Sequence, residues 1–396
     1  MTATPTPEVL VTGLGTVSCL GTGVDAYWHG LTSAVPRPAP VAGLTERVPG
    51  VLAYQVPDGP RWSAPAGEPD GRAARFALHA ARQAVADAGL TDDEIADMAV
   101  VIGTAAGESG ARDTLTGPAD HWTPVFRLAS AVGGELGAFG TNITIGNACA
   151  ASGYALSVAM DLVARGEAET VLVGGAEALA WAPLASFSRL GANDPERCRP
   201  FDADRRGTVF GEGAAMLVVQ SARAAAGRAS YGRLRGTAWS CDAHHLTAPD
   251  PEGGQLVRAA REALAQAAAG PAAVGCVVPH GTGTAHNDVV ETRVLREVFG
   301  ADLDRVPLFS LKAFIGHTAG AAAAFAVAAA ALMTRHGIVP ANIAPDRQDP
   351  DCPVWLPTAA PVPLERPQVL VNAYAFGGSN VSLVFGGENR EQRDGS

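Results

Sequence analysis

The chain has 396 residues, of which 47% are hydrophobic, so it can bury the core of one large α/β unit or of about two to three average domains. Its 29 basic and 40 acidic side chains give a net charge of −11, which argues against nucleic acid or an anionic membrane as the main partner. The most apolar run, residues 319–333, is dominated by alanine and is typical of a buried helix, so we expect no membrane-spanning segment.

The N-terminal half combines short apolar strands with helices. Residues 1–7 have neither the basic nor the apolar region of a secretory signal. Residues 9–15 predict a strand followed by a glycine turn, but Ser18 stands where a dinucleotide-binding fingerprint needs its third glycine. Residues 33–70 are rich in proline and glycine and predict an irregular surface segment. The other elements predicted in this half are helices at 73–89 and 148–165, strands at 99–103, 170–174 and 214–220, and a loop at 104–125.

The C-terminal half repeats this alternation after an arginine- and glycine-rich break at residues 223–236. Most strands are continuous apolar runs, which indicates that helices cover both faces of the sheet. We therefore expect an α/β fold with two halves, residues 1–235 and 236–388, and a frayed charged tail at 389–396. The elements predicted here are helices at 256–269, 289–299 and 320–336, and strands at 275–279, 369–373 and 381–385, the last two antiparallel.

Cys149 is the first candidate for chemistry. The six cysteines show no metal-ligand spacing, so we expect reduced cytosolic thiols, a cytoplasmic protein and no metal site. Cys149 differs from the others because a strand ends just before it and a helix begins at it. The N–H groups and dipole at a helix N-terminus favour the thiolate, which is the nucleophilic form. The alternative is a small buried thiol that only fills space.

His280 follows a predicted buried strand and enters a glycine-rich loop that carries Thr282 and Thr284. An imidazole at a strand end can exchange a proton near neutral pH. The two threonine hydroxyls could bind a polar ligand. A histidine satisfied by the loop backbone is the alternative.

Lys312 is the only lysine, because the other 28 of the 29 basic residues are arginines. Lysine differs from arginine where a compact ammonium must fit a tight pocket. A buried lysine needs an anionic partner, and Glu291 on the helix after His280 is the candidate. His317 follows five residues later, where another strand is predicted to pass into a helix. Compositional drift with one surviving lysine is the alternative.

The sequence Phe376-Gly377-Gly378 predicts a turn whose backbone can approach a ligand closely. An N–H group there, with the N–H of Cys149, could stabilise an oxyanion. A plain hairpin turn is the alternative. His244 and His245, read as neighbours in a strand, should point to opposite faces, and His286 is interpreted as an ordinary surface or packing histidine.

Together these clusters resemble the β-ketoacyl synthases of the thiolase superfamily over nearly the whole chain. The resemblance implies a thiolase-like fold, with duplicated mixed-sheet halves and helices in αβαβα layers. The motifs that carry it are Val-Thr-Gly-Leu-Gly from residue 11, Asn-Ala-Cys-Ala from 147, residues 199–205 with 211–213, residues 242–243 with 247–249, His-Gly-Thr-Gly-Thr from 280, Lys312 with Gly316-His317, and residues 376–380.

The resemblance also implies roles for these residues. Cys149 would accept an acyl chain from the phosphopantetheine arm of an acyl carrier protein. His280 and His317 would assist decarboxylation of a malonyl thioester, with no metal or other cofactor. The remaining implied roles are charge balance by Lys312 paired with Glu291, an oxyanion hole from the N–H groups of Cys149 and Phe376, a gate at the acyl pocket by the Phe376 side chain, and substrate binding by Thr282, Thr284, Phe376, Gly377 and Gly378.

The two-histidine pattern resembles the elongating synthases of fatty acid or polyketide biosynthesis. By this resemblance the chain is a decarboxylative condensing enzyme that forms a homodimer, or a heterodimer with a subunit like a chain-length factor. An acyltransferase or hydrolase that does not condense, or a chain-length-determining partner subunit, are the alternatives. Carrier docking would need basic groups, for which Arg72, Arg75, Arg205 and Arg206 are candidates.

The sequence departs from the family pattern in three places. The segment 107–149 is short, Ala285-His286-Asn287 replaces a more usual Pro-x-Gly, and Tyr374-Ala375 stands where Phe-Gly is common. These departures indicate a specialised synthase, for polyketides or polyenes rather than for housekeeping fatty acid elongation.

Overall fold

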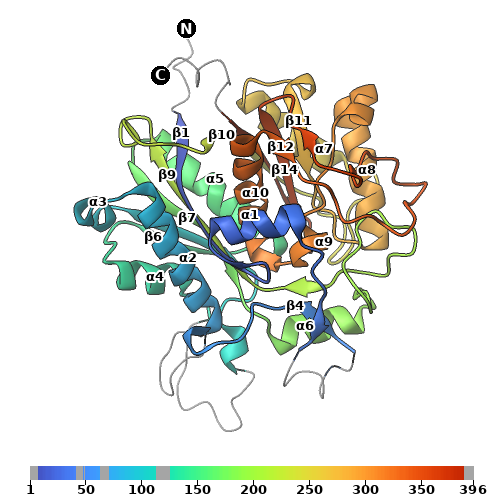
Figure 1. Ribbon diagram of the computed structural model, residues 1–396, viewed down its shortest axis with the longest axis horizontal. Coiled ribbons are helices and arrows are strands. Elements are labelled where there is room, and N and C mark those ends of the chain that lie inside the picture. The colour runs from blue at the N-terminus through green and yellow to red at the C-terminus, as the bar shows by residue number, and fades with distance from the viewer. Residues whose placement is uncertain (1–7, 42–47, 49, 63–70, 113–124, 388–396) are drawn as a thin grey trace.

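The computed structural model describes residues 8–41, 48, 50–62, 71–112 and 125–387, so the predicted tail at 389–396 lies outside the described residues. Its helices and strands form five layers in the order αβαβα (Figure 1). Three main hydrophobic cores fill the spaces between these layers. Strands that are buried on both faces explain the continuous apolar runs of the sequence.

The strands form two half-sheets. They join where β1 and β10 pair over only three residues, Val9 to Val11 with Leu234 to Gly232, so that together they form one ten-stranded sheet. The N-terminal half-sheet runs β1 (Val9–Ser18), β9 (Gly213–Ser221), β7 (Thr170–Glu177), β5 (Ala99–Thr104) and β6 (Asn142–Gly146), with β2 (Gly21–Thr22) beside β1. The C-terminal half-sheet runs β10 (Gly232–Cys241), β15 (Ser379–Gly386), β14 (Gln368–Tyr374) and β11 (Val274–Val278).

Helices supply the other three layers. α2 (Arg72–Ala88) and α4 (Leu128–Leu136) cover the N-terminal half-sheet, and α7 (Gly254–Gln266) and α8 (Ala285–Phe299) cover the C-terminal one. α5 (Ala151–Ala164) and α10 (Ala322–His336) lie between the half-sheets. The segment Ala319–His336 is long and apolar enough to cross a membrane, but 83% of it is buried inside the molecule, as in a core helix.

The other elements connect or flank these layers. The helices are α1 (Val24–Ser33), α3 (Asp92–Ala96), α6 (Trp181–Arg189) and α9 (Lys312–Ile315). The strands are β3 (Ala39–Pro40), β4 (Leu52–Tyr54), β8 (Phe210–Gly211), β12 (Ile338–Val339) and β13 (Val362–Pro363). The 3-10 turns are η1 (Pro60–Trp62), η2 (Ser109–Arg112), η3 (Ala148–Ala150), η4 (Pro271–Ala273), η5 (Gly300–Arg305) and η6 (Ala319–Ala321).

The predicted glycine turn after the first strand is wrong. Gly13 and Gly15 lie inside β1, where α2 crosses the strand at very close range. A Cβ atom at Gly13 would lie 2.1 Å from the carbonyl oxygen of Ala84, and one at Gly15 would lie 2.0 Å from that of Ala80. These glycines therefore permit close helix-on-strand packing.

Strand β10 was not predicted, because its sequence falls in the arginine- and glycine-rich break. Arg233 and Arg235 point outward along β10 while their neighbours are buried, so the strand alternates. The predicted boundary between residues 235 and 236 falls inside β10. The predicted loop at 104–125 contains η2, and its residues 113–124 lie outside the described chain.

Candidate active site

Cys149 lies in η3, the single turn that leads into α5, and is only 8% exposed. Ala148, just before it, has a φ of 43°, a left-handed conformation that is strained for a residue with a Cβ. The Cys149 Sγ lies 3.0 Å from Nε2 of His317. The residues 149 and 317 are far apart in the sequence, and the fold brings them into contact.

The electrostatics of Cys149 contradict the predicted thiolate. Burial raises the pKa of the Cys149 thiol to about 11, against the lowering effects of Lys312 and of the N–H groups of Phe376 and of Cys149 itself. Desolvation of the charged form outweighs the helix N-terminus and the ammonium. The resting side chain is therefore a thiol, and it needs a base.

We expect alkylation of Cys149 by iodoacetamide to report this pKa. Because only the thiolate reacts, the rate should rise about tenfold per pH unit between roughly pH 7 and 9.5. Mass spectrometry of the peptide containing Cys149 measures the rate. The exposed Cys241 serves as an accessible comparison in the same sample. A rate that is already level at neutral pH would indicate a preformed thiolate and contradict this assignment.

His280 and His317 face each other beside the thiol. Their ring centroids are 5.5 Å apart, and the rings are nearly perpendicular at 87°. Burial lowers the pKa of both histidines well below the ordinary value, and the charge of Lys312 lowers both further. Both rings are therefore neutral at physiological pH. Each can accept a proton at one nitrogen and donate one from the other.

Lys312 and Glu291 do not form the direct pair that the sequence predicted. The Lys312 ammonium donates to the carbonyl oxygen of His280. Glu291 instead accepts hydrogen bonds from the backbone N–H groups of His280 (2.7 Å) and Gly281 (2.8 Å). Lys312 and Glu291 thus both hold the backbone of His280, and together they position its imidazole.

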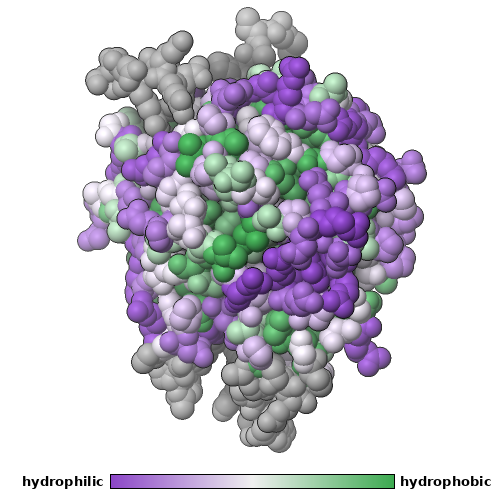
Figure 2. All heavy atoms as spheres, turned by 45° about the vertical axis from the view of Figure 1, so that its right-hand side comes forward, coloured by the Kyte–Doolittle hydropathy of each residue, from purple (hydrophilic) through white to green (hydrophobic). Residues whose placement is uncertain are grey.

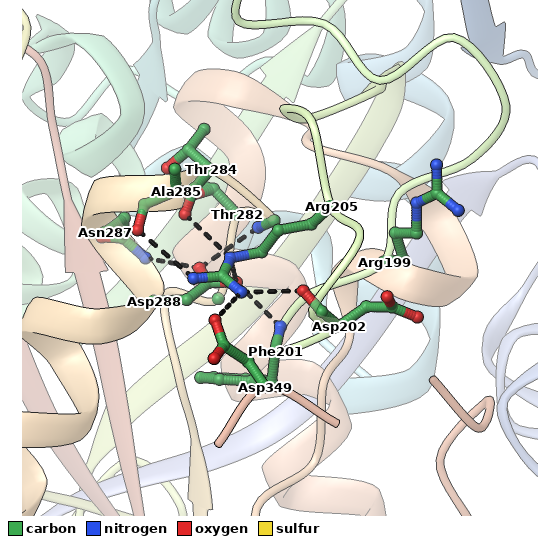
Figure 3. A network of polar contacts seen from close by, with 12 residues as sticks. Arg199, Phe201, Asp202, Arg205, Thr282, Thr284, Ala285, Asn287, Asp288 and Asp349 are labelled. Carbon is green, nitrogen blue, oxygen red and sulfur yellow. Dashed lines mark hydrogen bonds and ion pairs between the residues drawn. The ribbon is translucent and has the colours of Figure 1, made fainter. Parts of the chain in front are cut away.

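A buried arginine holds the loop that follows His280 (Figure 3). The guanidinium of Arg205 forms ion pairs with Asp288 (3.4 Å) and Asp349, and donates to the carbonyl oxygens of Thr284 and Ala285. This arrangement joins three parts of the chain: residues 202–205, the start of α8 with Thr284 before it, and Asp349. It also excludes Arg205 as a carrier-docking residue, because the side chain is only 4% exposed.

Arg72 and Arg206, two other candidates for carrier docking, differ in how far their guanidinium groups are exposed and already paired. Arg72 is held by Glu212 and Asp58, with a closest contact of 2.7 Å. Arg206 is 60% exposed, pairs loosely with Glu196 at 3.3 Å, and lines the cavity that contains Cys149. Arg206 is therefore the better candidate at the mouth of the site.

Two cavities meet at Cys149. The outer cavity, of about 440 Å³, is lined by Cys149, His280, His317, Thr282 and Thr284 among others. Its volume lies in the range of small-molecule sites. A larger hollow of about 930 Å³ near Trp355 and Arg366 contains none of the predicted site residues.

The inner cavity, of about 130 Å³, is apolar and is bounded in part by Leu184 and Phe210. Phe376 and Phe187 line both cavities and stack with ring centroids 4.9 Å apart, at an angle of 5°. This aromatic pair stands between the two spaces, which is where a gate would be needed.

Gly377 and Gly378 shape the turn behind Phe376, with φ angles of 87° and 79°. Their N–H groups are already used, because Gly377 donates to Leu246 and Gly378 to Ala375. Neither glycine lines the outer or the inner cavity. The turn therefore places Phe376, but the two glycines do not offer the free donors that the sequence suggested.

Four residues of the site were not predicted. His245 and His286 line the outer cavity, and His245 lies in an irregular loop rather than a strand. Glu177 lines the inner cavity, and burial raises its pKa to about 7 against the N–H groups of Ala105, Ala106 and Gly320. Tyr374, at the end of β14, flanks His280. The substitution of Tyr374 for the more usual phenylalanine was the available signal.

Family models match the chain in two adjacent blocks. Residues 63–225 match the model described as "Beta-ketoacyl synthase, N-terminal domain", and residues 231–345 match "Beta-ketoacyl synthase, C-terminal domain". The short gap between the two matches lies just before β10.

Known proteins resemble the chain along its whole length. It is 32% identical to 3-oxoacyl-(acyl-carrier-protein) synthase 2 of Synechocystis sp., over 96% of this chain and 97% of that protein. It is also 32% identical to "Putative polyketide beta-ketoacyl synthase 1" of Streptomyces halstedii, over 98% and 99%.

Two solved structures have the same fold. A chain of the ishigamide ketosynthase/chain length factor superposes with a TM-score of 0.88 and 33% identity, over 97% of this chain and 100% of that one. A chain of a type II acyl-carrier protein complex with its ketosynthase superposes with a TM-score of 0.85 and 26% identity, over 96% and 100%. These likenesses confirm the predicted thiolase-like fold.

Proposed function

The chain belongs to the β-ketoacyl synthase family, and from that premise we propose that it condenses an acyl chain held on Cys149 with a malonyl unit held by an acyl carrier protein. The contact of 3.0 Å between the thiol and His317 is the observation that carries this proposal. It places a nucleophile and a base together beside a second imidazole.

The first half-reaction loads the acyl chain. A carrier-bound acyl thioester enters the outer cavity, and Nε2 of His317 takes the proton as Cys149 attacks the carbonyl carbon. The N–H groups of Cys149 and Phe376 stabilise the oxyanion that forms. The carrier thiol then leaves with the proton from His317. The acyl chain passes the Phe376–Phe187 pair into the inner apolar cavity.

The second half-reaction forms the carbon–carbon bond. Malonyl thioester occupies the outer cavity, with Thr282 and Thr284 beside its phosphopantetheine arm. As the bond to the carboxylate breaks and carbon dioxide leaves, the electron pair passes into an enolate. In this half-reaction each neutral imidazole carries its proton on Nε2 and donates a hydrogen bond to the enolate oxygen, since Nδ1 of both rings is buried. For His317 this is the other tautomer from the one that accepts the thiol proton during loading. The enolate carbon attacks the acyl-Cys149 thioester, the bond between the acyl carbon and Sγ breaks, and the released thiolate takes a proton from solvent water, which restores the thiol. We propose that these steps need no metal or other cofactor.

A carrier protein and a second synthase-like subunit are the proposed partners. The two solved structures described above are named as a ketosynthase with a chain length factor and as a ketosynthase with its carrier protein. β6 lies at the edge of the described sheet, and the half-exposed Phe126 packs on its end at Gly146. An open strand edge is a ready pairing surface, so we propose that a second copy or a chain-length-factor-like subunit covers it.

The surface of the protein fits this proposal. Apolar side chains also gather near the centre of the face shown in Figure 2, with a hydrophilic band beside them. Patches of this kind are common at protein contacts. We also propose that the protein is cytoplasmic, which fits its six free cysteines.

Turnover with carrier-bound substrates tests the proposed function. The protein is first incubated with a panel of acyl-carrier thioesters, and the mass shift on Cys149 identifies the primer. Malonyl-carrier protein is then added, and we expect carbon dioxide release together with a product longer by two carbons. Acylation without carbon–carbon bond formation would identify an acyltransferase or hydrolase. Absence of any acylation would identify a partner subunit.

A further inference from the structure

Glu177, at the end of β7, is a buried carboxylate that none of the steps above uses. The residue is only 4% exposed, and it lines the inner cavity. Burying a carboxylate is costly unless its oxygens are well hydrogen-bonded. The groups that bond to Glu177 therefore show which parts of the chain it holds in place.

Four donors from two separate segments bond to this carboxylate. Its Oε2 accepts from the backbone N–H of Ala105 at 2.7 Å and from that of Gly320 at 3.0 Å. Its Oε1 accepts from the N–H of Ala106 at 2.9 Å and from the hydroxyl of Thr104 at 3.3 Å. Four donors fill the acceptor sites of a carboxylate. One side chain thus ties the turn after β5 to η6.

The two segments that Glu177 joins both form the inner cavity. Ala105 and Ala106 line it from the turn after β5, and Ala319 lines it from η6. The segments lie very close, because a Cβ atom at Gly320 would lie 2.3 Å from the backbone nitrogen of Ala105. No backbone hydrogen bond joins these two described segments directly. Ala319 also has a strained φ of 41°, so η6 needs the restraint that Glu177 supplies.

We propose that Glu177 is a positioning residue that sets the width of the inner cavity, and thereby the acyl chains that Cys149 accepts. This inference rests on the proposed function, in which the acyl chain enters that cavity. The cavity is small, at about 130 Å³. One methylene more or less in an apolar pocket changes selectivity by about 10- to 200-fold. A small movement of either segment therefore changes which primer is loaded.

The variant Glu177→Gln tests this inference, because it keeps the size of the side chain. Glutamine has one oxygen, so its NH2 group must face the N–H of Ala106 or those of Ala105 and Gly320. Two donors repel each other, and we expect the two segments to move apart. Loading of Cys149 is then measured by mass shift, with acyl-carrier thioesters of increasing length. The ratio of kcat/KM for a long primer to that for a short one should rise about tenfold.

A milder variant tests the same link if Glu177→Gln does not fold. Thr104→Val nearly keeps the shape of the side chain, but it removes the longest of the four hydrogen bonds, at 3.3 Å. It also removes the acceptor of the Gly107 N–H, at 2.9 Å, which belongs to the same turn. The ratio should rise in the same direction by a smaller factor.

Asp87→Asn is the control for lost stability. Asp87 also joins separate segments, since it accepts from the N–H of Leu14 and the hydroxyl of Tyr231, both at 2.9 Å, and it lines neither cavity. This variant should unfold at lower denaturant concentration and keep the wild-type ratio. An unchanged ratio in Glu177→Gln, or an equal rise in Asp87→Asn, would overturn the inference. Wild-type protein that loads no acyl chain onto Cys149 would overturn the proposed function instead.

Discussion

Replacing Cys149 with alanine is expected to reduce condensation by at least about 10⁴-fold, because no other described group can carry the acyl chain in this cavity. Loss of a nucleophile removes the covalent intermediate altogether. His280 and His317 remain in the variant, and both still line the outer cavity. Decarboxylation of malonyl-carrier protein should therefore fall by no more than about tenfold. Product mass and carbon dioxide release measure the two reactions separately.

The control for this variant is Cys352→Ala. Cys352 is also buried, but it lines neither the outer nor the inner cavity. Its replacement should change stability slightly and leave both reactions intact. If Cys149→Ala still forms the condensed product, the covalent route proposed here is wrong. If it loses decarboxylation as completely as condensation, the histidines do not act independently of the thiol.

The layered fold could be predicted from the sequence because its strands are apolar on both faces and its helices have clear ends. The helix predicted at 73–89, for example, is α2, and Gly89 ends it in a left-handed conformation with a φ of 61°. Strand β10 could not be found in the same way, because several of its buried positions, such as Gly232, Gly236 and Ser240, lack the large apolar side chains that mark a strand. Gly13 and Gly15 were misread because glycine signals both a turn and a close approach, and only the position of α2 distinguishes the two.

The members of the site could be predicted better than their states. Cys149, His280 and His317 were predicted from their motifs, and the structure brings the three side chains together. The protonation of Cys149 could not be predicted, since it depends on how deeply the thiol is buried. The hydrogen bond from Lys312 to the His280 carbonyl could not be predicted either. It depends on how the fold places the backbone of His280 next to both Lys312 and Glu291.

The variant Arg205→Met should have the largest effect on stability. Arg205 is 4% exposed, and it compensates Asp288, which is fully buried, and Asp349, which is 15% exposed. Removing the guanidinium leaves these charges without their cation and frees the carbonyl of Asp202, now bonded at 2.7 Å. Loss of one partner from a buried ion pair costs about 3–5 kcal/mol. Denaturant unfolding should show this loss.

The neighbouring residue supplies the control, because Arg206 is 60% exposed and Arg206→Met should change stability by less than about 0.5 kcal/mol. Arg205→Lys keeps the charge but not the planar fork that spans three loops, so it should recover only part of the loss. Arg205 also fixes the backbone of Thr284 and Ala285, next to the proposed site of the phosphopantetheine arm. The partly stable lysine variant should therefore show a raised KM for carrier-bound substrate. Equal stability of Arg205→Met and Arg206→Met would show that the buried network does not hold these loops.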